Sequence, residues 1–166
     1  MRKEALYLQI FFAILGETMT SDTSYEPIVD LEGIERLDLW DECHDAVQTI
    51  LKSLDADVAE LCPSVIASSG CNRGRSWGLF TYRTFKPPQD SDIDPVVVGI
   101  IFSESQGKII LSADISDETR GNTLFLLPER VTERPVVMEA AKELAQELAK
   151  QSLLVGKALV DLNRIA

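Results

Sequence analysis

The chain has one histidine and three cysteines, the side chains with which nucleophilic or metal chemistry would begin. His44 directly follows Cys43, but neighbouring positions on a helix point about 100° apart, so these two side chains do not face a common metal ion. A single histidine also excludes zinc sites built from several histidines. A Cys–His dyad would need Cys62 or Cys71 to be brought to His44 by the fold. We therefore expect no catalytic residue and interpret His44 as a partly buried histidine.

Cys71 lies in a stretch of turn-forming residues, 68–76, together with two arginines. Positive neighbours lower the pKa of a thiol, and a glycine-rich cationic loop can contact an anion. The phosphatase pattern Cys-x5-Arg fails because its arginine position holds tryptophan. As an alternative function we predict a small-ligand or anion-binding domain that uses the Cys71–Trp77 loop. Its predicted contacts are Cys71, Arg73, Arg75 and Trp77.

The net charge of −11 is concentrated in one quarter of the chain. Residues 20–60 hold twelve acids and two bases, a sum of −10, whereas residues 61–86 hold four bases and no acid. One interpretation is that the acidic and basic stretches pair within the fold, or are solvated faces. The other is an acidic face that docks a basic protein partner. The predicted partner-binding residues are Asp38, Asp41, Glu42 and Asp45.

The composition is that of a soluble globular protein, with 45 % hydrophobic and 26 % charged residues. The acidic balance and the sparse aromatic residues, 7 %, argue against nucleic-acid binding. Three cysteines without a repeated spacing indicate a reducing, cytoplasmic location rather than a disulfide framework. No apolar run reaches the roughly 20 residues that a bilayer requires, so we expect no membrane span.

Two acidic groupings in the second half of the chain have the residue types of a metal site. Residues 90–94 begin like a calcium loop, but the glycine and glutamate that an EF-hand needs later in the loop are missing. Asp114 with Glu104 and Lys108 would suit metal-dependent cleavage, but their spacing straddles a turn and need not bring them together. We therefore expect no metal and no cofactor.

Residues 1–35 are interpreted as an N-terminal extension and lead-in, followed by a single α+β domain over 36–166. The apolar run Ala5–Leu15 follows two basic residues but lacks the small-residue cleavage site of a signal peptide. Three interpretations stay open for it: an extension ahead of a natural start at Met19, a terminal helix packed on the domain, or a targeting segment.

Hydrophobic spacing predicts the elements of the domain. Apolar residues at helical intervals predict a helix that begins at Asp38 as its N-cap, and a short second helix over 57–67. The loops that follow are too short for helical crossovers, so the strands are expected to form an antiparallel meander. The four predicted strands cover residues 77–86, 96–103, 108–115 and 123–127.

From Val137 to the C-terminus, apolar residues repeat at alternating intervals of four and three and predict one long amphipathic helix. This helix is expected to pack on one face of the sheet; the alternative is a seam between two copies in a homodimer. The predicted architecture is thus α+β: acidic N-terminal helices, a four-stranded antiparallel meander sheet and a long C-terminal helix. Without a convergent polar constellation, we expect a protein-interaction module of chaperone, inhibitor or immunity, or regulatory type rather than an enzyme. An enzyme that uses Cys71 or His44 is a further alternative that the sequence leaves open.

Overall fold

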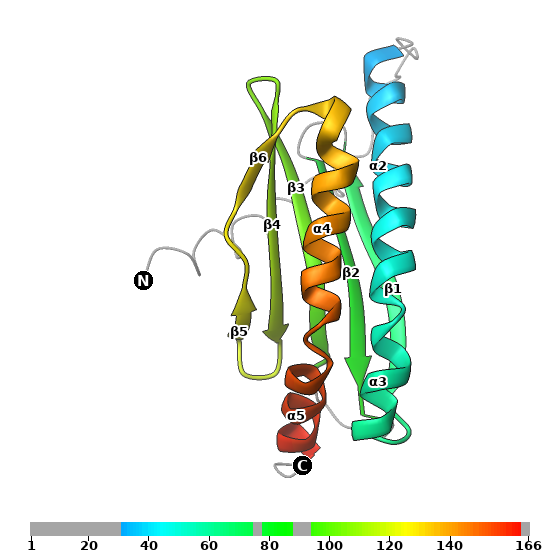
Figure 1. The fold of residues 1–166 in the computed structure, drawn as a ribbon, viewed down its shortest axis with the longest axis vertical. Coiled ribbons are helices and arrows are strands. Elements are labelled where there is room, and N and C mark those ends of the chain that lie inside the picture. The colour runs from blue at the N-terminus through cyan, green and yellow to red at the C-terminus, as the bar shows by residue number, and fades with distance from the viewer. Residues whose placement is uncertain (1–30, 75–77, 88–93, 164–166) are drawn as a thin grey trace, which may run out of the picture. The chain divides into compact units, whose positions relative to one another are not determined.

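The computed structural model describes residues 31–74, 78–87 and 94–163, which form an antiparallel sheet covered by helices (Figure 1). The helices are α2 (Leu31–Leu51), α3 (Leu54–Leu61), α4 (Val137–Ala149) and α5 (Ser152–Asn163), with a 3-10 turn η2 (Arg134–Val136) before α4. The strands are β1 (Ile66–Gly74), β2 (Gly78–Lys86), β3 (Val96–Ser105), β4 (Lys108–Asp117), β5 (Asn122–Leu126) and β6 (Arg130–Thr132). The predicted α+β class is confirmed.

The sheet is a meander in the order β1-β2-β3-β4-β5. The short β6 also pairs with β4, at residues 109–111, whereas β5 pairs with β4 at residues 114–117. All of these pairings are antiparallel, as the short connections predicted. Helices α2 and α4 lie side by side over one face, α2 against β1 and β2 and α4 against β3 and β4 (Figure 1). The sheet therefore has one face turned to the helices and one turned away from them.

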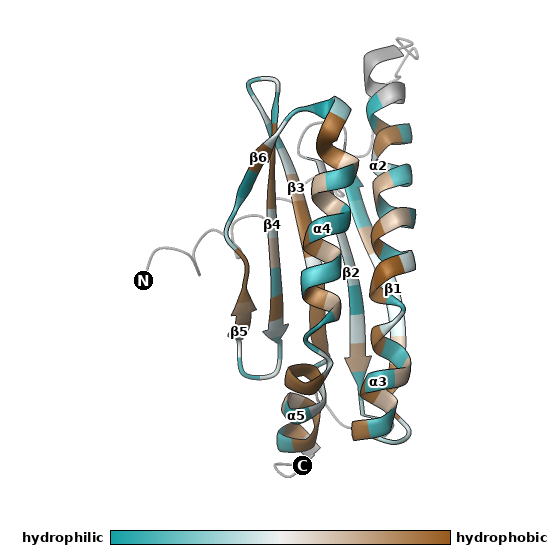
Figure 2. Cartoon of the chain, viewed as in Figure 1, coloured by the Kyte–Doolittle hydropathy of each residue, from teal (hydrophilic) through white to brown (hydrophobic). Residues whose placement is uncertain are grey.

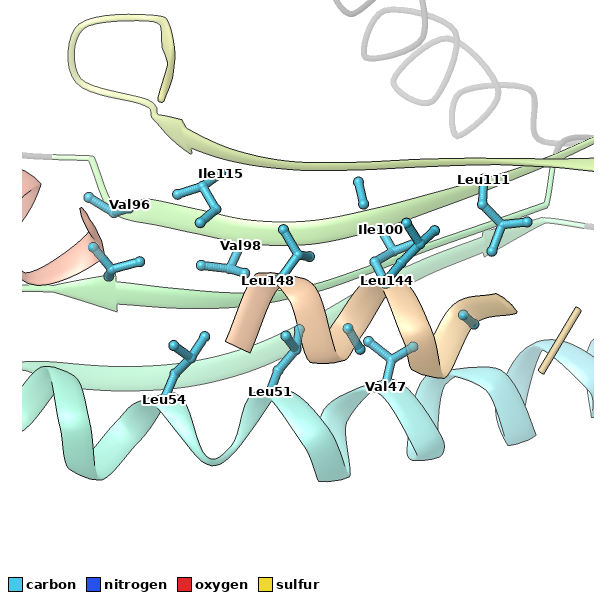
Figure 3. Packing of buried hydrophobic residues seen from close by; sticks show 14 of the residues in the cluster. Val47, Leu51, Leu54, Val96, Val98, Ile100, Leu111, Ile115, Leu144 and Leu148 are labelled. Carbon is cyan, nitrogen blue, oxygen red and sulfur yellow. The ribbon is translucent and has the colours of Figure 1, made fainter. Parts of the chain in front are cut away.

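The core lies between this helical layer and the sheet. Apolar and polar residues alternate along α2 and α4 (Figure 2), so each helix buries one stripe. Val47 and Leu51 of α2 and Leu144 of α4 point toward the strands, where they meet residues such as Ile100 (Figure 3). All four are at most 1 % exposed. Within the described residues, no helix is long and apolar enough to cross a membrane.

The sheet has more strands than the four expected, because the predicted turn at 68–76 is wrong. Residues 66–74 form β1, which pairs with β2 over its whole length. Glycine and serine have low strand propensity, but ladder pairing with the aromatic-rich β2 overrides it. The short β6 was also not expected, because three residues are too few to show a period.

Two predicted helix boundaries are also wrong. Helix α2 begins at Leu31, inside the expected lead-in, so Asp38 lies in its interior and is not the N-cap. The second helix, α3, spans Leu54–Leu61 rather than 57–67, and the chain re-enters the sheet at Ile66.

The single C-terminal helix is replaced by two, α4 and α5, which are separated at Lys150 and Gln151. The break lets α5 pack against α3. A Cβ atom at Gly156 would lie 2.6 Å from Leu61 Cδ1, so glycine allows this close approach. The apolar stripes of α4 and α5 are buried in the chain's own core, and the expected packing on the sheet is confirmed for α4. Leu153 is 70 % exposed and stands outside this buried stripe, and the homodimer through these helices stays a prediction.

Candidate functional site

The four acids predicted to bind a partner share the outward side of α2. Successive helical positions are rotated by about 100°, which places all four within an arc of about 100° on the side opposite the buried stripe. That stripe contains Trp40, Cys43 and Val47, each fully buried. The acids are all exposed, and we call them the α2 acidic stripe: Asp38, Asp41, Glu42 and Asp45.

One acid of this stripe is already paired within the fold. Arg73 of β1 forms an ion pair with Asp41, and both side chains are about half exposed. Farther along, Arg83 of β2 binds Asp55 of α3 through both carboxylate oxygens, with Arg83 Nε 2.5 Å from Asp55 Oδ1. The interpretation that the acidic and basic stretches pair with each other is therefore correct for these two pairs.

The two ion pairs differ in their surroundings. Arg83 is only 6 % exposed, so its guanidinium is nearly desolvated and depends on its carboxylate. The pair of Arg73 and Asp41 is open to solvent, where such pairs contribute roughly 0–1 kcal/mol. The Arg83 pair is thus a structural link between α3 and the sheet, and the Arg73 pair is a weaker link between α2 and the sheet edge.

Three acids of the stripe stay without such a link. Among the described residues, no lysine or arginine lies within ion-pair distance of Asp38, Glu42 or Asp45. They stand at intervals of four and three residues, so they are neighbours on the helix surface. The outward side of α2 therefore carries three adjacent, exposed, unneutralised carboxylates.

The predicted ligand loop is placed only in part. Cys71 and Arg73 are exposed on β1, the edge strand, whereas Arg75 and Trp77 lie outside the described residues. An extended strand does not offer the curved run of backbone amides that cradles an anion. Arg73 also points to Asp41. The alternative function stays a prediction, with one of its cations already engaged by an acid.

His44 is a partly buried histidine, as expected. Its Nδ1 is 2.8 Å from the Thr81 hydroxyl oxygen, and Gln48 Nε2 donates to the same oxygen at 3.1 Å and to the Tyr82 carbonyl at 2.9 Å. These contacts tie α2 to β2. Burial raises the pKa of Cys43 to about 12, helped by the charge of Glu42, so its thiolate is strongly disfavoured. Cys43, which is buried in the core, and His44, which contacts β2, therefore both stabilise the packing of α2 on the sheet.

In the described part of the chain, no group of three or more histidine, cysteine, aspartate or glutamate side chains could hold a metal ion. Glu104 points to the helical side, where its carboxylate is 2.8 Å from Arg36 Nε and 2.9 Å from Arg134. Asp114 lies between two buried residues of β4, so its side chain belongs to the other face of the sheet. The three residues Asp114, Glu104 and Lys108 therefore do not converge. Sequence reasoning missed the bridge that Glu104 makes to Arg36 and Arg134.

Comparisons of this chain with protein-family models, curated proteins and solved structures find no match. The functional argument consequently depends on the chemistry of the described residues alone.

Proposed function

We propose that this chain is a small acidic protein-interaction module that docks a basic protein partner through the α2 acidic stripe. The supporting observation is that Asp38, Glu42 and Asp45 are exposed and that no lysine or arginine of the described residues neutralises them, although Asp41 beside them has an arginine partner. A chaperone, an inhibitor or immunity protein, or a regulatory subunit would use such a face. The three cysteines are free thiols, which fits action in the cytoplasm.

The spacing of the acids favours a cationic partner on energetic grounds. Like charges three or four residues apart on a helix repel each other by roughly 0.2–0.5 kcal/mol per pair. The free protein carries this repulsion between Asp38 and Glu42 and between Glu42 and Asp45. A partner that places lysine or arginine over the stripe removes it and gains attraction that steers association.

Affinity capture from native lysate tests the proposal, with the full chain as bait and the bound species identified by mass spectrometry. The wild type should retain a stoichiometric basic protein at low salt and release it at high salt. The variant D38N/E42Q/D45N should lose it. The matched control D57N/E60Q/E133Q removes the same charge at exposed acids elsewhere and should retain it.

Two results would overturn the proposal. One is a wild-type bait that captures no stoichiometric protein. The other is equal loss of the captured protein by both triple variants, because the net charge rather than the stripe would then be responsible.

A further inference from the structure

The face of the sheet that is turned away from the helices carries an organised row of residues across five strands. Direct cross-strand partners point to the same side of a sheet. The pairings join Gly70 to Tyr82, Tyr82 to Gly99, Gly99 to Asp114, and Asp114 to Leu126. The buried positions of β4 alternate with this row, so the row lies on the side opposite the core.

Two aromatic rings lie flat along this face. The Phe80 and Tyr82 ring centroids are 4.8 Å apart. A Cβ atom at Gly70 would lie 2.5 Å from the Tyr82 hydroxyl oxygen, and one at Gly99 would lie 2.7 Å from Phe80 Cε2. The rings therefore occupy the space above the two glycines of the neighbouring strands. Any larger residue at these positions would push them away from the sheet.

Asp114 is the direct cross-strand partner of Gly99, the glycine that the Phe80 ring covers, whereas the Tyr82 ring extends the other way, over Gly70. Burial raises its pKa to about 6, and the charge of Glu118 raises it further in the same direction. The two hydroxyls that flank it are used elsewhere: Ser112 donates to Glu129 at 3.1 Å and Ser116 donates to Glu118 at 2.8 Å. Within the described residues, Asp114 has no hydrogen bond and no ion pair.

Exposed apolar side chains surround the row on the same face. Leu126 is 48 % exposed opposite Asp114, and Val131 is 62 % exposed opposite Ile110. Ile66, opposite Lys86, is 54 % exposed on the edge strand. A lone small cation would leave these side chains in water, whereas a polypeptide segment would cover them.

We propose that this face binds an extended segment of a partner polypeptide, with an arginine or lysine side chain of that segment seated over Phe80 and bound to Asp114. The ring faces attract a cation, and a carboxylate with few donors of its own gains most from a charged donor. Glu118 and Glu129 add negative charge nearby, while Lys86 lies at the far end of β2. This site shares no residue with the α2 acidic stripe, so its failure would leave the proposed function standing.

Nuclear magnetic resonance of the full-length ¹⁵N-labelled protein tests this inference. The probe is a blocked heptapeptide of alternating threonine and valine with a central arginine. It should shift the amide signals of Gly70 and Gly99 saturably. A peptide with citrulline, the neutral isostere of arginine, should bind at least about tenfold more weakly, because the charged hydrogen bond is lost. Blocked arginine amide alone should also bind more weakly.

The variant D114N should bind the arginine peptide at least about tenfold more weakly than the wild type. The control D57N, at an exposed acid on α3, should bind this peptide with unchanged affinity. The carboxyl signal of Asp114 in ¹³C-labelled wild type gives a second readout that needs no variant, since a bound cation must lower the pKa of Asp114. Equal affinity for the arginine and citrulline peptides would overturn the inference, as would the absence of saturable shifts. Binding of arginine amide as tight as that of the peptide would overturn the polypeptide assignment.

Discussion

Arg73 on the edge strand β1 forms an ion pair with Asp41 on α2. The sequence assigned these residues to two different sites, Arg73 to an anion-binding loop and Asp41 to a partner-binding face. The fold brings them together because α2 lies over β1 and β2. The pair reduces the acidic stripe to three unneutralised carboxylates and occupies the one arginine of the loop that the structure describes.

The two ion pairs between the helices and the sheet should contribute unequally to stability. In D55N the nearly buried guanidinium of Arg83 loses its charged partner, which should cost about 1–3 kcal/mol because Asp55 itself is partly solvated. In the matched variant D41N the exposed Arg73 pair is lost, which should cost less than about 1 kcal/mol. Urea unfolding of both variants measures the difference. Equal costs would contradict the distinction.

Asp114 should make the protein less stable as the pH rises. Its pKa is raised from 3.8 to about 6 in the fold, so the folded state binds the proton more tightly than the unfolded state. The contribution of protonated Asp114 to the free energy of unfolding is fully present below about pH 4 and is lost as the pH rises through about 6.

The variant D114N lacks this titration. It should therefore exceed the wild type by about 1–2 kcal/mol at about pH 7.5, a value reduced for partial exposure, and lose this advantage at about pH 4. Thermal or urea unfolding at the two pH values measures it. A stability difference that does not change with pH would show that Asp114 is not perturbed.

Gly78, the first residue of β2, should not tolerate a side chain. Its φ is +123°, and a Cβ atom there would lie 1.9 Å from the carbonyl oxygen of Phe102 on β3. G78A should cost about 3 kcal/mol or more, because strained backbone and a clash with backbone add together. The control G107A has a φ of +74° but open space, and should cost about 1 kcal/mol. Similar unfolding free energies for the two variants would contradict the close approach of Gly78 on β2 to Phe102 on β3.

Elements whose hydrophobic residues keep a regular spacing over many positions could be predicted from the sequence. The stripe of Trp40, Val47 and Leu51 defined α2, and short connections defined the antiparallel meander. Strand β1 was missed because its serines and glycines resemble a turn until β2 is present to pair with them. The break at Lys150 was missed because the apolar repeat continues across it, although the chain turns there to pack α5 on α3.

The contacts at the candidate sites depend on distances that the sequence does not contain. The outward position of Asp38, Glu42 and Asp45 followed from helical periodicity, but the neutralisation of Asp41 required knowledge of which strand lies beneath α2. The row that joins Tyr82 to Asp114 requires the register of three strands, which hydrophobic alternation alone does not set.

The most direct test of the proposed function measures the affinity of the captured basic partner for purified wild type and variants as a function of salt. D38N/E42Q/D45N should weaken binding about tenfold at low salt, because each exposed charge contributes modestly to the affinity. It should also flatten the salt dependence, because the charges that salt screens are removed. The control D57N/E60Q/E133Q should keep both the affinity and the salt slope. An unchanged affinity in D38N/E42Q/D45N would contradict docking through the α2 acidic stripe.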